Sequence, residues 1–326
     1  MADAQNSAGQ KRISNFSMAV QKKVYWLLLI SFAIRAFLAA YLEFGNDEVY
    51  YWTYALYPDW SHFDHPPMVG WVMQFFSLNL LFDSEFFLRL ASVVFTTINT
   101  FLIFLIGKKI KDEVTGFYAA LLYTASIYAF VITGIFILPD TPQNLFWMLG
   151  IYLMVRLLDE NQSIKSWNLT MIGLGLVIGL GMISKYTSVF LWFGIGLYVL
   201  FYKRIWLKKP ALYFALILSA ACTLPVILWN LNNDFISFSF QGERVNIFSS
   251  SLRLDYFFRE LFGQIAYNNP INFVLVALAV FTIFKGRKWL RSDYQHIILF
   301  ISIPLIGIFL VFSLFRPTLP HWTGPA

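Results

Sequence analysis

A series of nine apolar stretches, separated by short polar segments, runs through the chain and limits its fold more than any other feature. A helix needs about 20 apolar residues to cross the roughly 30 Å of hydrocarbon in a bilayer. Only 13% of the residues are charged, against about 25% in a typical soluble domain. The sequence therefore predicts an all-α polytopic membrane protein with about nine spans. They are Val24–Leu42, Phe86–Gly107, Val114–Thr133, Pro142–Leu158, Trp167–Ile183, Tyr186–Tyr202, Ala211–Trp229, Leu261–Phe284 and Ile297–Phe315.

The basic residues are unevenly divided between the two sides of this predicted bundle. If the N-terminus is cytoplasmic, most of the 24 lysines and arginines fall in inner segments. Because cytoplasmic loops carry an excess of Lys and Arg, we expect an N-in topology. Residues 1–23 would then be cytoplasmic, and residues 44–85 would form the first extracytoplasmic loop. The same short basic clusters account for the net charge of +6, so membrane lipid is an expected partner and nucleic acid is not.

One polar segment, Phe44–Trp71, collects acids, histidines, tryptophans and a Pro-Pro pair between the first two spans. Clustered ionisable groups do not help a chain to bury helices in lipid, so we expect the centre of an active site here. Asp47 and Glu48 follow the first span, and neighbouring residues on a helix point about 100° apart. The two carboxylates should therefore have different roles. The alternative is an acidic helix start in which Asn46 or Asp47 is the N-cap.

The motif around His65 leaves a metal site open. Histidine and aspartate are ordinary ligands of divalent metals, so Asp64 and His65 could hold such an ion. No other cofactor is suggested, and the spacing is not that of a specific metal motif. In the alternative interpretation, His65 is held by a carboxylate or itself contacts a phosphate.

Further charged residues fall at the same predicted membrane surface. Asp140 lies between the third and fourth spans, where it could also cap the helix that starts near Pro142. Lys185 lies in the very short turn between the fifth and sixth spans. It is either an interfacial lysine with its ammonium group in water or a cation that holds a lipid phosphate. Arg244 and Arg316, in the outer loops, are additional candidates for phosphate contact.

Taken in chain order, these motifs resemble those of bacterial GT-C membrane glycosyltransferases, in particular relatives of the protein O-mannosyltransferases and the lipid A aminoarabinose transferase (glycosyltransferase family 39). The matching pieces are Asp47-Glu48 with Tyr50-Tyr51-Trp52, Phe63-Asp64-His65-Pro66-Pro67, Leu138-Pro139-Asp140-Thr141-Pro142, Ser184-Lys185-Tyr186-Thr187, Trp229-Asn230 with Ser237-Phe238-Ser239-Phe240-Gln241, and Leu319-Pro320-His321-Trp322. They extend over nearly the whole chain, so we expect one transmembrane glycosyltransferase domain over residues 1–326. Such relatives also carry further helices or a soluble domain, which indicates a C-terminal truncation.

The resemblance implies an enzyme of the bacterial inner membrane. It would pass a sugar from a polyprenyl-phosphate donor to a glycolipid, lipopolysaccharide or protein acceptor at the extracytoplasmic face, with inversion at the anomeric carbon. Asp47 would be the general base, Glu48 its catalytic or supporting neighbour, and Asp140 a second acid. Lys185 would contact the carrier phosphate. His65 stands where aminoarabinose transferases have a lysine.

A transporter or flippase of a lipid-linked sugar is the competing interpretation. Transporters place ionisable groups near the bilayer midplane, on broken helices and often in two similar halves. This chain concentrates its polar residues at one predicted membrane surface and shows no such halves. The pattern therefore favours the enzyme.

Overall fold

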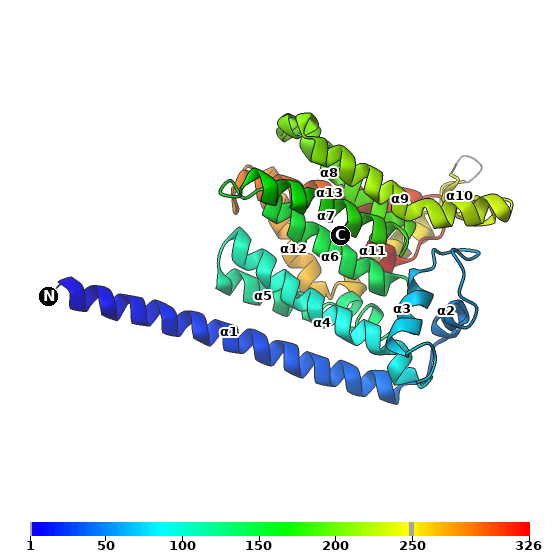
Figure 1. Cartoon of the computed structure of the whole chain (residues 1–326), viewed down its shortest axis with the longest axis horizontal. Coiled ribbons are helices and arrows are strands. Elements are labelled where there is room, and N and C mark those ends of the chain that lie inside the picture. The colour runs from blue at the N-terminus through cyan, green and yellow to red at the C-terminus, as the bar shows by residue number, and fades with distance from the viewer. Residues whose placement is uncertain (1, 248–250) are drawn as a thin grey trace.

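The computed structural model describes residues 2–247 and 251–326, with side chains from residue 17 onward outside that gap. Lys11 and Arg12, which contribute to the predicted charge asymmetry, lie outside the described side chains. The described chain is all-helical (Figure 1), which confirms the all-α part of the predicted fold class. Its α-helices are α1 (Ala2–Tyr41), α2 (Asn46–Leu56), α3 (Met68–Phe76), α4 (Glu85–Ile110), α5 (Glu113–Ala125), α6 (Asp140–Leu157), α7 (Ile164–Met182), α8 (Val189–Tyr202), α9 (Pro210–Asn232), α10 (Ile236–Val245), α11 (Leu254–Tyr267), α12 (Pro270–Phe284) and α13 (Ser292–Phe312). Four short 3-10 or π-helical turns are η1 (Tyr128–Ile132), η2 (Tyr186–Ser188), η3 (Arg204–Lys208) and η4 (Pro320–Thr323).

Five of the described helices are long and apolar enough to cross a membrane. They are the Ser17–Tyr41 part of α1, α4, α7, α9 and α13. The pair α11 and α12 makes a sixth span if it is counted as one broken helix, because the two meet with a bend of 104°. The nine spans expected from the sequence are therefore not shown, although each predicted range contains helix.

The three remaining predicted spans are too short or too polar to pass as ordinary transmembrane helices. Val114–Thr133 is interrupted after the 13 residues of α5 and continues as the π-helical turn η1. Tyr186–Tyr202 begins with the 3-10 turn η2, which leaves 14 residues for α8. α6 carries Gln143 and Asn144, both fully buried in the protein. Polar side chains within an apolar segment face other helices rather than lipid.

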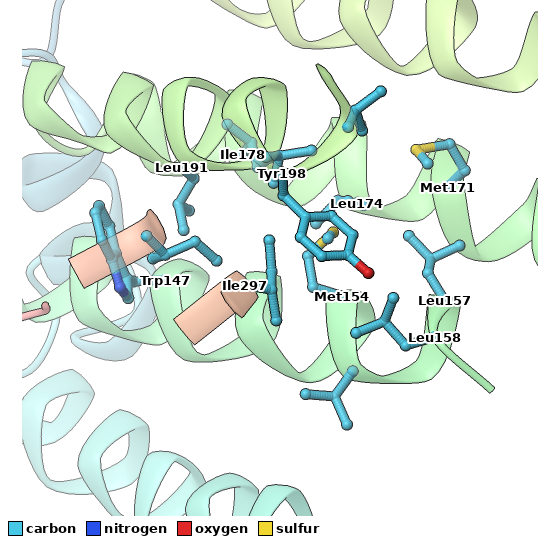
Figure 2. Close-up of a cluster of buried hydrophobic side chains, with 14 of the residues drawn as sticks. Trp147, Met154, Leu157, Leu158, Met171, Leu174, Ile178, Leu191, Tyr198 and Ile297 are labelled. Atoms are coloured by element: carbon cyan, nitrogen blue, oxygen red, sulfur yellow. The ribbon is translucent and has the colours of Figure 1, made fainter. Parts of the chain in front are cut away.

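The largest apolar core lies where α6, α7, α8 and α13 pack together (Figure 2). Its labelled members include Trp147, Met154, Leu174, Tyr198 and Ile297. Lipid tails are as apolar as these side chains, so close packing rather than exclusion of water holds the helices together. α7 and α9 approach very closely at a glycine: a Cβ added to Gly175 would lie 2.3 Å from the backbone oxygen of Ala215.

α1 packs along α4 and α5 (Figure 1). Its membrane-spanning part carries a buried arginine. The side chain of Arg35 is 0% exposed. Its guanidinium lies 4.7 Å from the ring centre of Phe130, and one terminal nitrogen is 3.4 Å from the hydroxyl of Ser31. The other two nitrogens have no hydrogen-bond partner in the described structure. Neighbouring helices, not lipid, therefore surround this charge.

The first loop, residues 44–85, contains the two short helices α2 and α3. They pack on the start of α4 through a small core that includes Tyr54, Val69 and Leu88. The backbone N–H of Met68 donates to the backbone oxygen of Ile183 over 3.2 Å. This bond connects the loop to Ile183, the residue after α7 and two residues before Lys185.

Candidate active site

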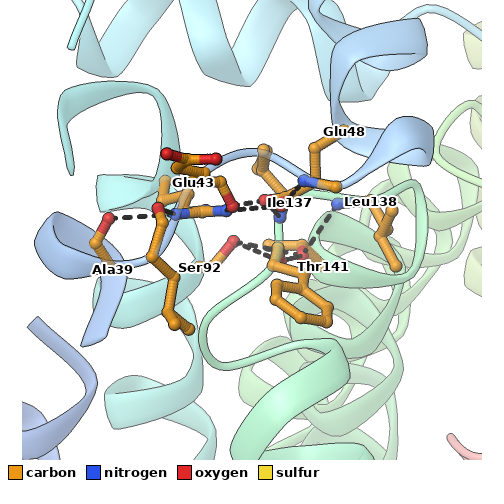
Figure 3. A network of polar contacts seen from close by, with 11 residues as sticks. Ala39, Glu43, Glu48, Ser92, Ile137, Leu138 and Thr141 are labelled. Atoms are coloured by element: carbon orange, nitrogen blue, oxygen red, sulfur yellow. Dashed lines mark hydrogen bonds and ion pairs between the residues drawn. The ribbon is translucent and has the colours of Figure 1, made fainter. Parts of the chain in front are cut away.

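Glu48 lies at the centre of a buried network where α1, α2 and α4 meet (Figure 3). Arg89 donates to both oxygens of its carboxylate, over 2.7 Å from Nε and 2.6 Å from a terminal nitrogen. The backbone N–H groups of Ile137 and Gly45 donate to the same two oxygens over 3.0 and 3.1 Å. Arg89 also donates to three backbone oxygens at the end of α1 and just beyond it, those of Ala39, Leu42 and Glu43.

The network joins the start of α2 to the segment that leads into α6. A carboxylate whose two oxygens each accept two hydrogen bonds has no free position at which to receive a proton from a substrate. Of the two roles that the resemblance allows for Glu48, catalysis and support, its contacts favour support. They also hold α2, with Asp47, in place relative to α6, with Asp140.

We expect Arg89→Met to lower the free energy of unfolding by about 3–5 kcal/mol, because the substitution leaves Glu48 charged and buried without its cation. Thermal unfolding in detergent would measure the loss. Lys109→Met is the matched control, since its ion pair with Asp159 is about one-third exposed and such pairs contribute about 0–1 kcal/mol. Equal melting temperatures for the two variants would show that the network does not stabilise the fold. Adding Glu48→Gln to Arg89→Met should recover part of the loss.

Asp47, the next residue along the helix, is exposed and forms no side-chain hydrogen bond or ion pair with the described part of the chain. The contrast with Glu48 agrees with the expectation that the two acids differ. The N-cap of α2 is Gly45, so the alternative in which Asn46 or Asp47 caps the helix is wrong. The charge of Asp47 acts on His321, as do the charges of Asp140 and Lys185. The free carboxylate thus lies within electrostatic reach of the same site.

Asp140 and Lys185 form a buried ion pair. The ammonium nitrogen of Lys185 lies 2.9 and 2.8 Å from the two carboxylate oxygens, and the residues are 2% and 5% exposed. Burial by itself raises the pKa of Asp140, but neighbouring groups, Lys185 foremost, outweigh it and hold that pKa below its ordinary value. Asp140 is therefore ionised and makes no cap bond to α6. An interfacial lysine would keep its ammonium group in water, so that alternative for Lys185 is wrong.

Buried polar groups that the sequence did not single out lie beside this pair. The hydroxyl of Tyr128 is close to Asp140 but has no well-formed hydrogen bond in the described structure. Oε1 of Gln143, one turn after Asp140 on α6, has no partner either. Because buried polar atoms are nearly always paired, these atoms are available to a ligand. Their sequence signal is weak: a tyrosine and a glutamine inside apolar stretches.

His65 is buried next to the ion pair, and burial lowers its pKa to about 4. Its imidazole is therefore neutral at pH 7. Nε2 lies 4.0 Å from a carboxylate oxygen of Asp64, whose other oxygen accepts hydrogen bonds from Tyr50 and Tyr54 over 2.9 and 2.6 Å. Among the described residues, no three His, Cys, Asp or Glu side chains come together as metal ligands would. The geometry therefore gives no support for a metal held by Asp64 and His65.

A cavity of about 360 Å³ lies beside the ion pair and is lined by Lys185, His65 and Arg244. Arg244 comes from α10, and its guanidinium lies 5.1 Å from the ring centres of both Phe240 and Trp322. The remaining walls are mostly apolar and include Val189, Phe190, Ile308, Phe309 and Phe312. The cavity therefore suits an amphipathic ligand with an anionic end and a hydrocarbon part.

Arg316 is placed elsewhere. It does not line this cavity, and its Nε donates to the backbone oxygen of Asn246 over 2.8 Å. The structure thus brings Lys185, His65 and Arg244 to one site and leaves Arg316 outside it. Sequence could not separate Arg244 from Arg316, because both are basic residues in long polar segments.

The family model described as dolichyl-phosphate-mannose-protein mannosyltransferase matches residues 64–229, slightly more than half of the chain. The chain belongs to this family. The matched range contains Asp140 and Lys185 and starts at Asp64, so Asp47 lies before it. Membership of this mannosyltransferase family confirms the resemblance drawn from the ordered motifs.

Two crystal structures of ArnT from Cupriavidus metallidurans share the fold of this mannosyltransferase family member. The apo structure aligns with a TM-score of 0.70 and 15% identity, over 96% of this chain and 57% of ArnT. The structure bound to undecaprenyl phosphate aligns with a TM-score of 0.72 and 16% identity, over 93% of this chain and 57% of ArnT. The chain is also 22% identical to the lipid A galacturonosyltransferase RgtD of Rhizobium johnstonii, over 87% of its own length and 58% of RgtD. It thus spans well under two thirds of each relative.

Proposed function

We propose that this protein transfers a sugar from a polyprenyl-phosphate donor to an acceptor at the extracytoplasmic face of the bacterial inner membrane. The observation that carries the proposal is the apolar cavity with Lys185 and Arg244 in its wall and Asp140 paired to Lys185. A carrier with one phosphate and a long hydrocarbon chain matches both parts of that cavity. Family membership and the likeness to an ArnT structure that holds undecaprenyl phosphate support the same donor class.

The proposed reaction is a direct displacement at the anomeric carbon. The acceptor hydroxyl oxygen forms the new bond to that carbon, the bond between the carbon and the phosphate oxygen breaks, and polyprenyl phosphate leaves with the electron pair. Asp47 takes the hydroxyl proton, since it is an exposed acid near the site and has no hydrogen-bond or ion-pair partner among the described side chains. Negative charge grows on the leaving phosphate, where Lys185 and Arg244 are already in position to stabilise it. Neutral His65 can donate or accept a hydrogen bond there.

The donor class is testable with the purified chain. We expect sugar transfer from synthetic polyprenyl-phosphate sugars and none from nucleotide sugars. The sequence contains neither a glycine-rich phosphate loop nor an acidic motif that would bind the metal ion of a nucleotide sugar. Release of polyprenyl phosphate would be followed by mass spectrometry, with a mixed lipopolysaccharide and glycolipid extract as acceptor. A preference for nucleotide sugars would overturn the proposal. Movement of the lipid-linked sugar across liposome membranes without transfer would favour the transporter.

The proposed orientation places the N-terminus and residues 1–23 in the cytoplasm and residues 44–85 outside. It rests on the distribution of basic residues, and nine membrane crossings remain part of this proposal. Reporter fusions after Asp59 and after Lys208 should therefore report opposite sides of the membrane. The same side for both would rule out this topology and, with it, the extracytoplasmic site.

The acceptor is proposed by class alone: a glycolipid, lipopolysaccharide or protein hydroxyl. RgtD, by its name, acts on lipid A, which favours a lipopolysaccharide acceptor. We further propose that residues 1–326 act as one transmembrane domain.

A further inference from the structure

A second hollow lies at the other end of α6 from the candidate active site. Asp140 begins α6 and Arg156 lies in its last turn, so the two are separated by about 24 Å along the helix axis. There, a groove of about 460 Å³ runs between the end of α6 and the start of α7. The proposed topology places this end at the cytoplasmic surface. The groove and the catalytic cavity therefore face opposite sides of the bilayer.

Two cations line this groove, and neither has an ion-pair partner among the described side chains. Arg156 comes from α6 and Lys165 from the first turn of α7. Three other basic side chains at the same end hold nearby acids: Lys109 pairs with Asp159, Lys203 with Asp293 and Arg291 with Glu160. The nearby acids are therefore already engaged. Arg156 and Lys165 are left to attract an anion from outside the chain.

The polar end of the groove also offers hydrogen-bond donors. The hydroxyls of Ser163 and Ser166 line it, next to the N-terminus of α7. Free N–H groups and the helix dipole favour negative charge at such a position. The two cations and the N-terminus of α7 therefore both favour an anion at this end of the groove.

The other end of the groove is apolar and open. It is lined by Leu153 and by Leu169, which is 61% exposed. Gly173 lies at this end, and a Cβ added there would meet no atom within 4 Å. Eight residues of helix separate Lys165 from Gly173, which is about 12 Å. A hydrocarbon chain can follow that path from the basic end toward the bilayer interior.

We propose that this groove binds one anionic phospholipid, with its headgroup phosphate at Arg156 and Lys165 and an acyl chain along Leu169 and Gly173. A free phosphate ion would use the basic end alone and would leave the apolar end uncovered. A zwitterionic lipid would cover both ends but would bring a positive group close to the two cations. Basic pockets between transmembrane helices at the cytoplasmic side suit anionic headgroups for this reason. The proposal does not depend on the proposed sugar transfer.

Native mass spectrometry of the full chain, titrated with dioleoyl phosphatidylglycerol or dioleoyl phosphatidylcholine, would test this. We expect one tightly bound phosphatidylglycerol per chain, and about 10- to 30-fold weaker binding when Arg156→Gln and Lys165→Gln are combined. The matched control combines Lys208→Gln with Lys288→Gln, two exposed lysines of the predicted cytoplasmic side that do not line the groove. It removes the same charge and should leave binding unchanged.

Two further experiments distinguish binding of the lipid from binding of other anions. Gly173→Leu should weaken binding of phosphatidylglycerol several-fold without unfolding the chain, because its side chain enters open space. Inorganic phosphate at millimolar concentration should not displace the lipid. Equal binding by the two double variants, equal retention of both lipids, or displacement by inorganic phosphate would each overturn the proposal.

Discussion

Asp47→Asn is expected to slow sugar transfer by about 10²–10⁴-fold, the usual cost of losing a general base, while donor binding stays within a few-fold of the native protein. The substitution keeps the size of the side chain and removes its capacity to take a proton. Asp47 forms no side-chain hydrogen bond or ion pair with the part of the chain that the structure describes, so the melting temperature should not change. Single-turnover transfer and donor binding, measured on the same preparation, would separate the two effects.

Asp83→Asn provides the matched control for this experiment. Asp83 is another exposed acid of the first loop, it has no partner among the described side chains, and it does not line the cavity. Its turnover should equal that of the native protein. If Asp47→Asn also retained native turnover, Asp47 would be only an acid in the first turn of α2. The general base would then have to be sought elsewhere, beginning with Asp140.

Lys185→Met is expected to have two separable effects. It leaves Asp140 charged and buried without its cation, which should lower the free energy of unfolding by about 3–5 kcal/mol. It also removes a charge-assisted hydrogen bond to the donor phosphate, worth about 1.5–3 kcal/mol, or roughly 10- to 100-fold in donor affinity. Unfolding in detergent and binding of a polyprenyl phosphate would measure these effects independently.

A double variant separates the two roles of Lys185, which are to neutralise buried Asp140 and to bind the donor phosphate. Combining Asp140→Asn with Lys185→Met removes both charges, so stability should largely return while donor binding stays weak. Lys185→Arg should keep more of the donor affinity than either, because it retains the charge. If the double variant bound the donor as well as the native protein, Lys185 would serve only to neutralise Asp140. Arg244 would then be the cation to test.

The sequence predicted the residue types of the site better than their contacts. Asp140 and Lys185 are 45 residues apart, and only their predicted depth suggested that they meet. Their direct pairing depends on how α6 and η2 pack, which local patterns do not encode. Glu48 and Asp47 could be expected to differ, but the sequence could not tell which one Arg89 would bind. That choice depends on the position of α4 behind α2.

The described structure shows fewer helices of spanning length than the nine apolar stretches predict, for a related reason. Hydropathy records how apolar a stretch is and does not record whether lipid or protein surrounds it. The range Val114–Thr133 is continuously apolar in sequence. Its helix nevertheless changes to a π-helical turn, which brings Tyr128 close to Asp140. The bend at Asn268 and Asn269, before Pro270, interrupts another apolar stretch. In both places the mean hydropathy of the stretch does not reveal that the helix is interrupted.

The buried arginine of α1 has a consequence for how the protein is made. Arginine near the middle of a spanning helix opposes insertion by about 2.5–3.5 kcal/mol, and the Phe130 ring that covers Arg35 is synthesised about 95 residues later. At about 5–20 residues per second, the ribosome needs roughly 5–20 s to make that partner. During this interval Arg35 has its contact with Ser31 on the same helix but not the Phe130 ring that covers it in the folded protein. The first helix should therefore stay beside the translocation channel, or with an insertion chaperone, until α4, α5 and η1 emerge to receive it.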